Sequence, residues 1–383
     1  MIETTLAELT LNITDGKHGD CRDKDGSGFY FVSCKDVKDG QINYENARQI
    51  LEEDFQDSHK RTKLEPDDIL VTNSGTIGRM AFVKDHPLTG RTTFQKSVAI
   101  VKPDKEKILP KYLYYQLQNC VDSFVNQSNG AAQKNLLLST MRAFKMSVHE
   151  DKEVQARIAA ALSAYDDLIE NNQKQIKLLE EAAQRLYKEW FVDLRFPGHE
   201  TTPIADGIPE GWAEGTLADL TVFKRGKTIT KEQVNEGTVP VVAGGLEPAY
   251  YHDTPNTDAP VITVSGSGAN AGFTRMYYTK VWASDCSYVD SSATQDIAWV
   301  YCFLKENKAS IDSMQKGAAQ PHVYAKDINA MKTVVPCDSI MEQFRSAAEP
   351  VFSKIGKLEI QIKQLAEARD RLLPKLMNGE IEV

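Results

Sequence analysis

The sequence predicts an α+β protein made of two similar halves, each a mixed α/β globular domain followed by a long helix. Three observations support this fold class. Short sequence blocks return in the same order in both halves, a heptad pattern closes each half, and the remainder alternates short β-branched runs with helical stretches. With 383 residues, of which 41% are hydrophobic and 26% charged, the chain is long enough for more than one buried core.

Four matched blocks establish the internal repeat. Because all four keep their order along the chain, they indicate a duplicated unit and therefore a pseudo-two-fold repeat. The pairs are TLAELT at Thr5 with TLADLT at Thr216, ILVTNSGTIGRMAFV at Ile69 with VITVSGSGANAGFTRMY at Val261, Gly-Ala-Ala-Gln at Gly130 with the same letters at Gly317, and LEEAAQRL at Leu179 with LAEARDRL at Leu365.

The blocks also predict the domain boundaries. A first globular domain of residues 1–150 precedes a long helix of residues 151–195. A linker of residues 196–212, which contains several Pro and Gly residues, leads to a second globular domain of residues 213–338 and a second long helix of residues 339–383. We call the two globular parts the first and the second domain.

Apolar residues at alternating steps of four and three predict the two long helices. One seam runs from Ile158 to Trp190 and the other from Phe344 to Leu376 in the same phase, so the helices are expected to pack on each other as a coiled coil. Within the first seam, Asn172 either fixes the register of the pair or lies near a bend or in a partly exposed position.

Two prolines fall in the second helix. Proline lacks a backbone N–H and its ring clashes with the preceding turn, so Pro350 predicts a short helical piece followed by the main helix from about Val351. Pro374 is expected to bend or end the helix at its other extremity.

Composition and charge restrict the class of protein. The formal net charge is -9 and no segment is basic overall, which argues against a nucleic-acid-binding protein that works alone. The six cysteines lie far apart without metal-ligand spacing and are interpreted as reduced thiols, and no metal site is predicted. A signal peptide and membrane-spanning runs are absent from the sequence, so a cytoplasmic location without membrane attachment is the expectation.

Catalytic motifs do not match the sequence. The Gly-Lys-Thr at Gly226 lacks the upstream glycine of a phosphate-binding P-loop, because Thr221 stands there. The chain has no Pro-Pro pair of the kind found in DNA adenine methyltransferase motifs, no convincing acidic pair with lysine for a nuclease, and no G-x-S-x-G elbow. We therefore expect a protein that is not itself an enzyme and has no cofactor in this chain.

The chain resembles the specificity (S) subunit of type I restriction-modification systems over its whole length. The resemblance rests on LLEEAAQRLYKEWFVDLRFPGHE at Leu178, RLLPKLMNGEIEV at Arg371, the two GAAQ blocks and the SGTIG loop. It implies two target recognition domains, each of which reads one half of a split site in double-stranded DNA. It also implies that the two long helices are antiparallel, hold the domains apart and dock two methyltransferase (M) subunits that contain S-adenosylmethionine. Restriction (R) subunits can add to this complex.

Base reading requires hydrogen-bonding side chains on loops, supported by Lys and Arg on phosphates. Each candidate could instead be a structural or solvated residue, and no base contact follows from the resemblance. The candidates in the first domain are Lys17, His18, Arg22, Asn73, Ser74, Thr76, Arg79, Lys96, Gln133 and Lys134, and those in the second are Lys224, Arg225, Lys227, Ser265, Ser267, Asn270, Arg275, Lys316, Gln320 and His322.

Apolar and aromatic side chains crowd the end of the first helix. They predict either a surface for partner subunits or packing against the adjacent domains. The residues of this group are Tyr187, Trp190, Phe191, Leu194 and Phe196. A non-DNA scaffold, with tandem domains on a coiled coil that joins protein partners, is the rival function, because it needs neither basic charge nor catalysis.

The duplicated Gly-Ala-Ala-Gln stretch is interpreted as the same junction in each half, where a domain closes before its helix. Its shared residues are expected to be framework. The next positions differ, Lys134-Asn135 against Pro321-His322, as two domains with different half-sites would require.

Overall fold

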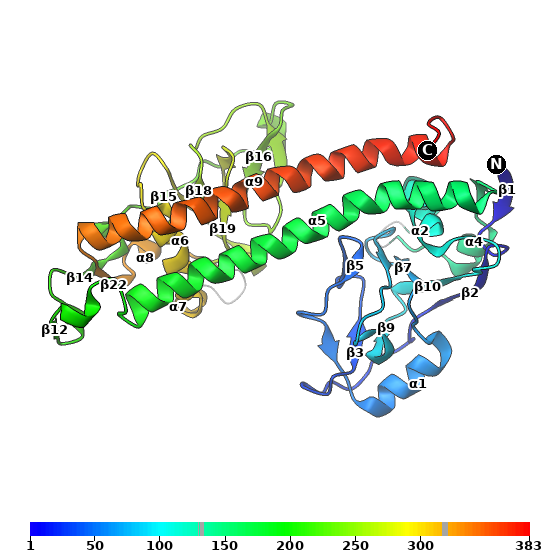
Figure 1. Cartoon of the computed structure of the whole chain (residues 1–383), viewed down its shortest axis with the longest axis horizontal. Helices are drawn as coiled ribbons and strands as arrows, with labels where there is room; N and C mark the ends of the chain where they lie inside the picture. Colours follow the sequence, from blue (N-terminus) through cyan, green and yellow to red (C-terminus); the bar gives the residue numbers. More distant parts are fainter. Residues whose placement is uncertain (129, 131–133, 316–320) are drawn as a thin grey trace. The chain divides into compact units, whose positions relative to one another are not determined.

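The computed structural model divides into two compact units. Unit 1 consists of Met1–Ile169 and Gln364–Val383, and unit 2 of Glu170–Lys363. Each unit therefore combines one globular domain with part of both long helices, as the colours of Figure 1 show. The described residues are 1–128, 130, 134–315 and 321–383.

The first domain alternates short strands with short helices. Its strands are β1 (Ile2–Thr5), β2 (Thr10–Asp15), β3 (Tyr30–Val32), β4 (Val37–Lys38), β5 (Gln41–Ile42), β6 (Arg48–Gln49), β7 (Ile69–Thr72), β8 (Met80–Phe82), β9 (Thr92–Phe94), β10 (Val98–Pro103) and β11 (Lys145–Val148). Its helices are α1 (Glu52–Thr62), the 3-10 turn η1 (Thr89–Arg91), α2 (Pro110–Asn119), α3 (Val121–Asn126) and α4 (Leu138–Ala143).

Two sheets form the layers of the first domain. One has the strand order β2-β10-β7-β8, and the other has the order β6-β3-β9, in which β3 pairs antiparallel with β6 and parallel with β9. Strand residues alternate between faces: Ile69 and Val71 join the core under the helices α2 and α5, while Leu70 faces the second sheet. Helix α1 covers the far side of the second sheet through Phe55, which packs near Phe31.

The second domain repeats this plan. Its strands are β14 (Ala213–Thr216), β15 (Lys224–Arg225), β16 (Val239–Val242), β17 (Tyr250–His252), β18 (Val261–Ser265), β19 (Thr274–Tyr277), β20 (Trp282–Ala283), β21 (Cys286–Asp290) and β22 (Lys332–Val335). Its helices and turns are η4 (Leu217–Asp219), η5 (Lys231–Gln233), η6 (Gly268–Asn270), α6 (Ile297–Glu306), α7 (Lys308–Ser313) and α8 (Ala325–Asn329). The preceding linker contains η3 (His199–Thr201) and the hairpin of β12 (Ile204–Ala205) and β13 (Ile208–Pro209).

Strand pairing shows that the two domains share one topology. The order β15-β21-β18-β19 corresponds to β2-β10-β7-β8, and β17-β16-β20 has the same antiparallel and parallel pairs as β6-β3-β9. Even the first repeat block folds alike, since the backbone N–H of Thr5 donates to the Glu8 carboxylate at 2.8 Å and that of Thr216 to Asp219 at 2.7 Å. The structure thus confirms the predicted α+β fold class of two similar halves.

The long helices are α5 (Lys152–Tyr187), which continues through the π-helical turn η2 (Lys188–Val192), and α9 (Asp338–Met377). In unit 1 the start of α5 shares a core with the end of α9, and in unit 2 the end of α5 shares a core with the start of α9. The pair is therefore antiparallel. No helix among the described residues is both long and apolar enough to cross a membrane.

The prediction of a helix break at Pro350 is wrong, because α9 runs through this residue without interruption. Pro350 and Ser346, whose carbonyl loses its helical donor, both lie on the exposed face, where water can bind that carbonyl. The opposite face is anchored by the buried Phe344, Ala348 and Phe352, which hold the helix together across the proline. Pro374 lies in the last turn, three residues before the helix ends at Met377.

Asn172 is buried, with 4% of its surface exposed, so the partly exposed alternative is wrong. Its Nδ2 has no hydrogen-bond partner within the described residues. A buried amide NH2 group left without a partner costs stability, and a role of Asn172 in setting the register stays a prediction.

Candidate nucleic-acid interface

In the first domain, four loops meet at one end of the sheet β2-β10-β7-β8. The chain leaving β2 bonds to the chain entering β10, since Gly16 N–H donates to the Val98 carbonyl at 3.1 Å and Lys17 N–H to the Phe94 carbonyl at 2.8 Å. The loop after β7 joins them, because Asn73 N–H donates to the Ser97 carbonyl at 3.0 Å. We call this surface the loop edge; its residues are 16–18, 73–79, 95–97 and 134–137.

The second domain has the same loop edge, made of residues 226–228, 266–272, 283–285 and 321–324. Gly226 N–H donates to the Cys286 carbonyl at 2.8 Å and Lys227 N–H to the Ala283 carbonyl at 2.9 Å. Gly266 N–H donates to the Asp285 carbonyl at 3.1 Å. Each bond has a counterpart at the matched position of the first domain, so the two frameworks are alike.

Close backbone approach explains one glycine in each domain. A Cβ atom on Gly16 would lie 1.9 Å from the Phe94 carbonyl oxygen, and one on Gly226 would lie 2.3 Å from that of Ser284. Only glycine fits between the two chains at these distances. Gly226 is therefore required by backbone packing at the loop edge.

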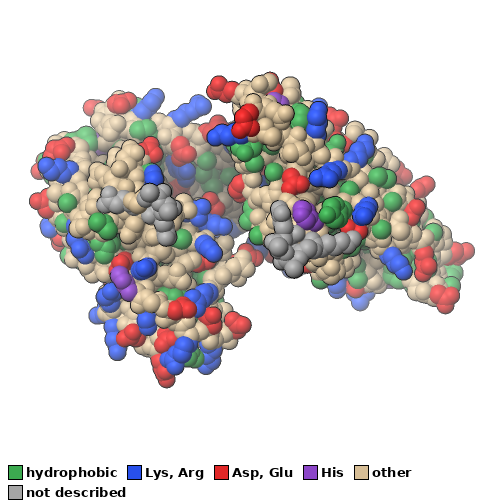
Figure 2. Space-filling model, turned by 180° about the vertical axis from the view of Figure 1, so that it is seen from behind, with side chains coloured by type: hydrophobic (Ala, Val, Ile, Leu, Met, Phe, Trp, Pro, Cys, Tyr) green, Lys and Arg blue, Asp and Glu red, His purple; other side chains and the backbone are tan. Residues whose placement is uncertain are grey.

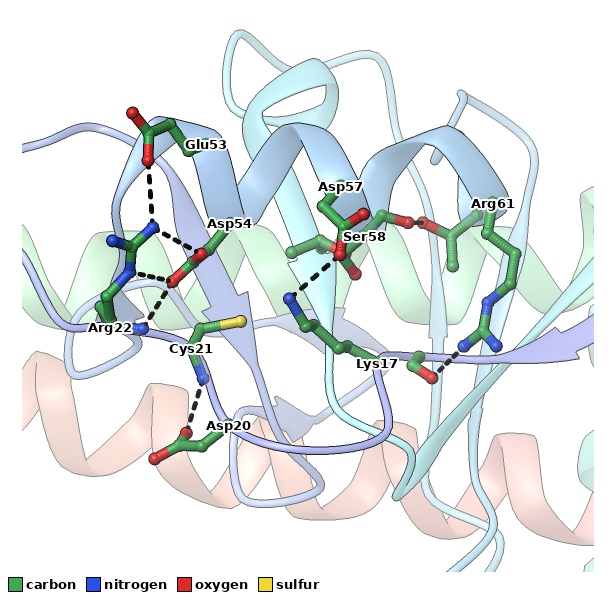
Figure 3. Close-up of polar contacts among 12 residues, drawn as sticks. Lys17, Asp20, Cys21, Arg22, Glu53, Asp54, Asp57, Ser58 and Arg61 are labelled. Atoms are coloured by element: carbon green, nitrogen blue, oxygen red, sulfur yellow. Dashed lines mark hydrogen bonds and ion pairs between the residues drawn. The ribbon is translucent and has the colours of Figure 1, made fainter.

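Carboxylates of α1 pair with the cations that follow β2 in the first domain (Figure 3). Lys17 pairs with Asp57 at 3.2 Å, and the Arg22 guanidinium contacts Asp54 at 3.0 Å. This guanidinium and the Arg22 backbone N–H lower the pKa of Asp54 to about 2. These contacts order the loop and leave Lys17 and Arg22 less positive charge to offer a phosphate. His18 likewise contacts its neighbour Asp15, at 2.9 Å.

Other cations remain available. Arg79, Lys96 and Lys134 are exposed and form no ion pair within the described part of the first domain. On the face shown in Figure 2, Lys and Arg side chains alternate with Asp and Glu over both domains rather than forming one basic field. Phosphate contacts would therefore come from individual side chains.

In the second domain, Lys224, Arg225 and Lys227 are exposed and likewise lack an ion pair among the described residues. Arg275 is engaged differently. Its guanidinium lies 3.8 Å from the Glu247 carboxylate, and its Cζ lies 4.8 Å from the centre of the Tyr277 ring.

Two candidate base readers, Asn73 and Ser265, have buried side chains. Asn73 is 4% and Ser265 3% exposed, and the Ser265 hydroxyl donates to the Gly244 carbonyl at 3.2 Å. The Asn270 amide reaches the same carbonyl at 3.4 Å, and the Ser267 hydroxyl donates to the Asp285 carboxylate.

The remaining candidates divide by position. Thr76 is exposed and Ser74 is partly buried, both in the loop after β7. The ring of His322 stacks against Tyr324, with centroids 5.9 Å apart. Gln133, Lys316 and Gln320 lie outside the described residues.

The apolar group at the end of the first helix packs inside unit 2. Tyr187 is 3% exposed and contacts Trp299 and Phe344 edge-on, while Phe196 is 2% exposed and packs on Trp212 at 4.8 Å between centroids. Members of this group that are half-buried, Trp190, Phe191 and Leu194, join the same clusters. Their burial favours intramolecular packing, the alternative that the sequence left open.

Sequence reasoning missed several parts of the loop edge. The matched pairs Gly16-Lys17 and Gly226-Lys227 were available as a fifth repeat block, but two residues are too short to stand out. Asp285 follows no motif, and its place in the loop edge depends on strand pairing that connects distant residues.

Comparisons with known proteins agree with this architecture. The model of the family described as "Type I restriction modification DNA specificity domain" matches residues 19–181 and 209–362. The specificity subunit of the type I restriction enzyme MjaIX from Methanocaldococcus jannaschii is 28% identical over 344 residues, which cover 82% of this chain and 78% of that protein. The HindI specificity subunit from Haemophilus influenzae is 22% identical over 392 residues, covering 79% of this chain and 84% of that protein.

A solved structure shares the fold. The S subunit of a type I restriction-modification system from M. genitalium superposes with a TM-score of 0.57 at 18% identity, covering 98% of this chain and 96% of that one. Nothing in these matches supports the rival scaffold function. The chain therefore belongs to the type I restriction-modification DNA specificity family, and its function is that of a specificity subunit.

Proposed function

We propose that each domain reads one half of a split site in double-stranded DNA through its loop edge. The observation that carries this proposal is the duplication of the loop edge: the backbone bonds at Gly16 and Gly226 match, while the exposed side chains around them differ. A fixed backbone that presents different hydrogen-bonding side chains is what direct readout of two different half-sites requires.

Exposed cations lie in or beside both loop edges and suit phosphate contacts. They are Arg79, Lys96 and Lys134 in the first domain and Lys224, Arg225 and Lys227 in the second. Because the chain as a whole is acidic, at -9, a partner subunit with a basic surface would supply much of the remaining attraction for DNA.

Two methyltransferase subunits, which would hold S-adenosylmethionine, are the partners that we assign to the helix pair. Leu178 on α5 is 65% exposed and Ile360 on α9 is 45% exposed, both within unit 2. Exposed apolar side chains on packed helices suit a partner surface. This chain would act without chemistry of its own, in the cytoplasm, and restriction subunits would join the assembled complex.

The helices would also set the spacing between the half-sites. Deleting one heptad from each helix shortens the pair by about 10 Å, which corresponds to about three base pairs of duplex. A folded variant of this kind is expected to select a shorter spacer, and an unchanged spacer would refute the role of the helices as a ruler.

Mapping methylated adenines in DNA from cells that carry the complete complex tests the proposal. A motif of two short specified parts separated by a fixed unspecified gap is expected. A continuous motif, or methylation that persists unchanged without this chain, would contradict it. Duplex binding measured at several salt concentrations supplies a second test, since the phosphate contacts predict that affinity falls as salt rises.

A further inference from the structure

The segments that follow the Gly-Ala-Ala-Gln stretches in sequence take the same backbone path in both domains. We call residues 134–137 and 321–324 the return segments. An isolated β-bridge pairs Ser74 with Asn135, and another pairs Ser267 with His322. One residue further along, Leu136 N–H donates to the Asn73 carbonyl at 2.8 Å, as Val323 N–H does to the Gly266 carbonyl at 3.1 Å.

Each return segment is anchored by its middle residue. Leu136 is 0% and Val323 2% exposed, and both lie in the core under the helices of their own domain. The next residues, Leu137 and Tyr324, have extended backbones and precede α4 and α8, so a helix fixes the far side of each segment.

The residues on either side of this anchor face away from the core. Side chains alternate in extended backbone, so a buried middle residue directs both neighbours to the opposite side. Asn135 and Leu137 are exposed in the first domain; in the second, His322 is half-buried and Tyr324 is exposed. These side chains lie beside the loops that contain Ser74 and Ser267.

The chemistry at the matched positions differs. Asn135 offers an amide, whose oxygen and NH2 group suit the donor and acceptor that adenine shows in the major groove. His322 lies nearly parallel to Tyr324, at 10° between the ring planes, and the Lys326 ammonium lies 5.8 Å from the centre of the Tyr324 ring. An imidazole N–H held in this way suits a base edge that carries acceptors, such as that of guanine.

We propose that Asn135 and His322 are specificity-determining residues, each setting the identity of one base in the half-site of its own domain. This inference rests on the proposed function, because it requires the loop edge to face DNA. It separates these two residues from Asn73 and Ser265, whose side chains are buried.

Exchange of the two side chains tests the inference. Asn135→His and His322→Asn each place a residue that the equivalent backbone position already accommodates in the other domain. Each variant is combined with its methyltransferase partner, and the methylated motif is mapped. The expected result is a changed base at one position of the matching half-site, with the other half-site retained. Loss of one good base contact corresponds to roughly 5- to 150-fold in discrimination.

Controls separate the possible failures. Asn12→His changes an exposed asparagine of β2 that pairs with Lys102, in the half of the strand farther from the loop edge, and should leave the motif unaltered. If the wild-type complex has no two-part motif, the proposed function fails. If it has one and both exchange variants retain it, the inference about Asn135 and His322 is overturned.

If an exchange variant loses binding to every duplex, a second variant is measured. Asn135→Ala removes the amide without adding volume, and its binding is compared on duplexes that carry each of the four bases at every position of the first half-site. Loss of the preference at one position supports the inference, and an unchanged ranking of the bases at all positions overturns it.

Discussion

Replacement of Gly16 by alanine should disrupt the loop edge of the first domain. The added Cβ would lie 1.9 Å from the Phe94 carbonyl oxygen and 2.4 Å from that of Gln95. Real Cβ atoms essentially never approach within 3.0 Å, and the obstacle is backbone rather than a flexible side chain. The two chains must therefore move apart by about 1 Å, an overpacking of the kind that forces backbone shifts.

This separation breaks two hydrogen bonds. They are the bond from Gly16 N–H to the Val98 carbonyl, at 3.1 Å, and the bond from Lys17 N–H to the Phe94 carbonyl, at 2.8 Å. At about 1 kcal/mol each, their loss lowers the free energy of unfolding of unit 1 by about 2 kcal/mol. For a unit of this size the thermal midpoint should fall by about 4–8 °C.

Gly90→Ala is the matched control, because no heavy atom lies within 4 Å of its added Cβ. Thermal unfolding and duplex binding are measured for both variants. Gly16→Ala should lower the midpoint and weaken recognition of the first half-site alone, while Gly90→Ala should leave both near their original values. Equal behaviour of the two variants would refute the close-approach explanation of the loop edge.

Three further predictions concern the helices and the ordered loop. Pro350→Ala restores a backbone donor on the exposed face of the helix, so it should raise the free energy of unfolding of unit 2 by about 2 kcal/mol, measured with urea. Destabilisation would contradict the explanation that water binds the Ser346 carbonyl. Asn172→Leu removes a buried NH2 group that has no partner among the described residues, so it should raise the free energy of unfolding by at least about 1 kcal/mol. The matched change at the exposed neighbour, Asn171→Leu, should not raise it, and equal effects would mean that burial is not the cause. Because Arg22 lowers the pKa of Asp54 from 3.8 to about 2, its ion pair stabilises the fold above about pH 4, and this contribution is lost as the pH falls through 2. The stability difference between the wild type and Asp54→Asn should therefore shrink as the pH falls and vanish only by about pH 1, and a pH-independent difference would exclude this linkage.

Most of the fold could be predicted from the heptad periodicity and the internal repeat of the sequence. The seams that end at Trp190 and Leu376 predicted both helices, since a heptad pattern depends only on local spacing. Pro350 misled the prediction because its cost, about 3 kcal/mol in a helix interior, is local, whereas the compensation by Phe344, Ala348 and Phe352 is tertiary. The local cost of the proline can be estimated from the sequence, whereas the tertiary packing that offsets it cannot.

The candidate site was predicted less completely for the same reason. Residue type suggested Lys17 and Arg22 as phosphate contacts, but α1 brings Asp57 and Asp54 against them. Residue type also suggested Asn73, whose burial depends on the loop after β7 folding over the sheet end. The charge and hydrogen-bonding capacity of a side chain follow from its residue type. Whether that side chain is free to bind DNA depends on neighbours that are distant in sequence.

The duplication itself separates framework from readout within a single chain. Where both domains need the same backbone, the residues agree in kind: Gly16 matches Gly226, and the apolar Leu136 matches Val323. Next to these fixed points the chemistry diverges, most clearly at Asn135 and its counterpart in the second domain. A structural role would favour similar residues at positions with identical backbone bonds, whereas recognition of two different half-sites favours different ones. The contrast between neighbouring positions, more than the chemistry of any one residue, is the reason to place base reading on the return segments.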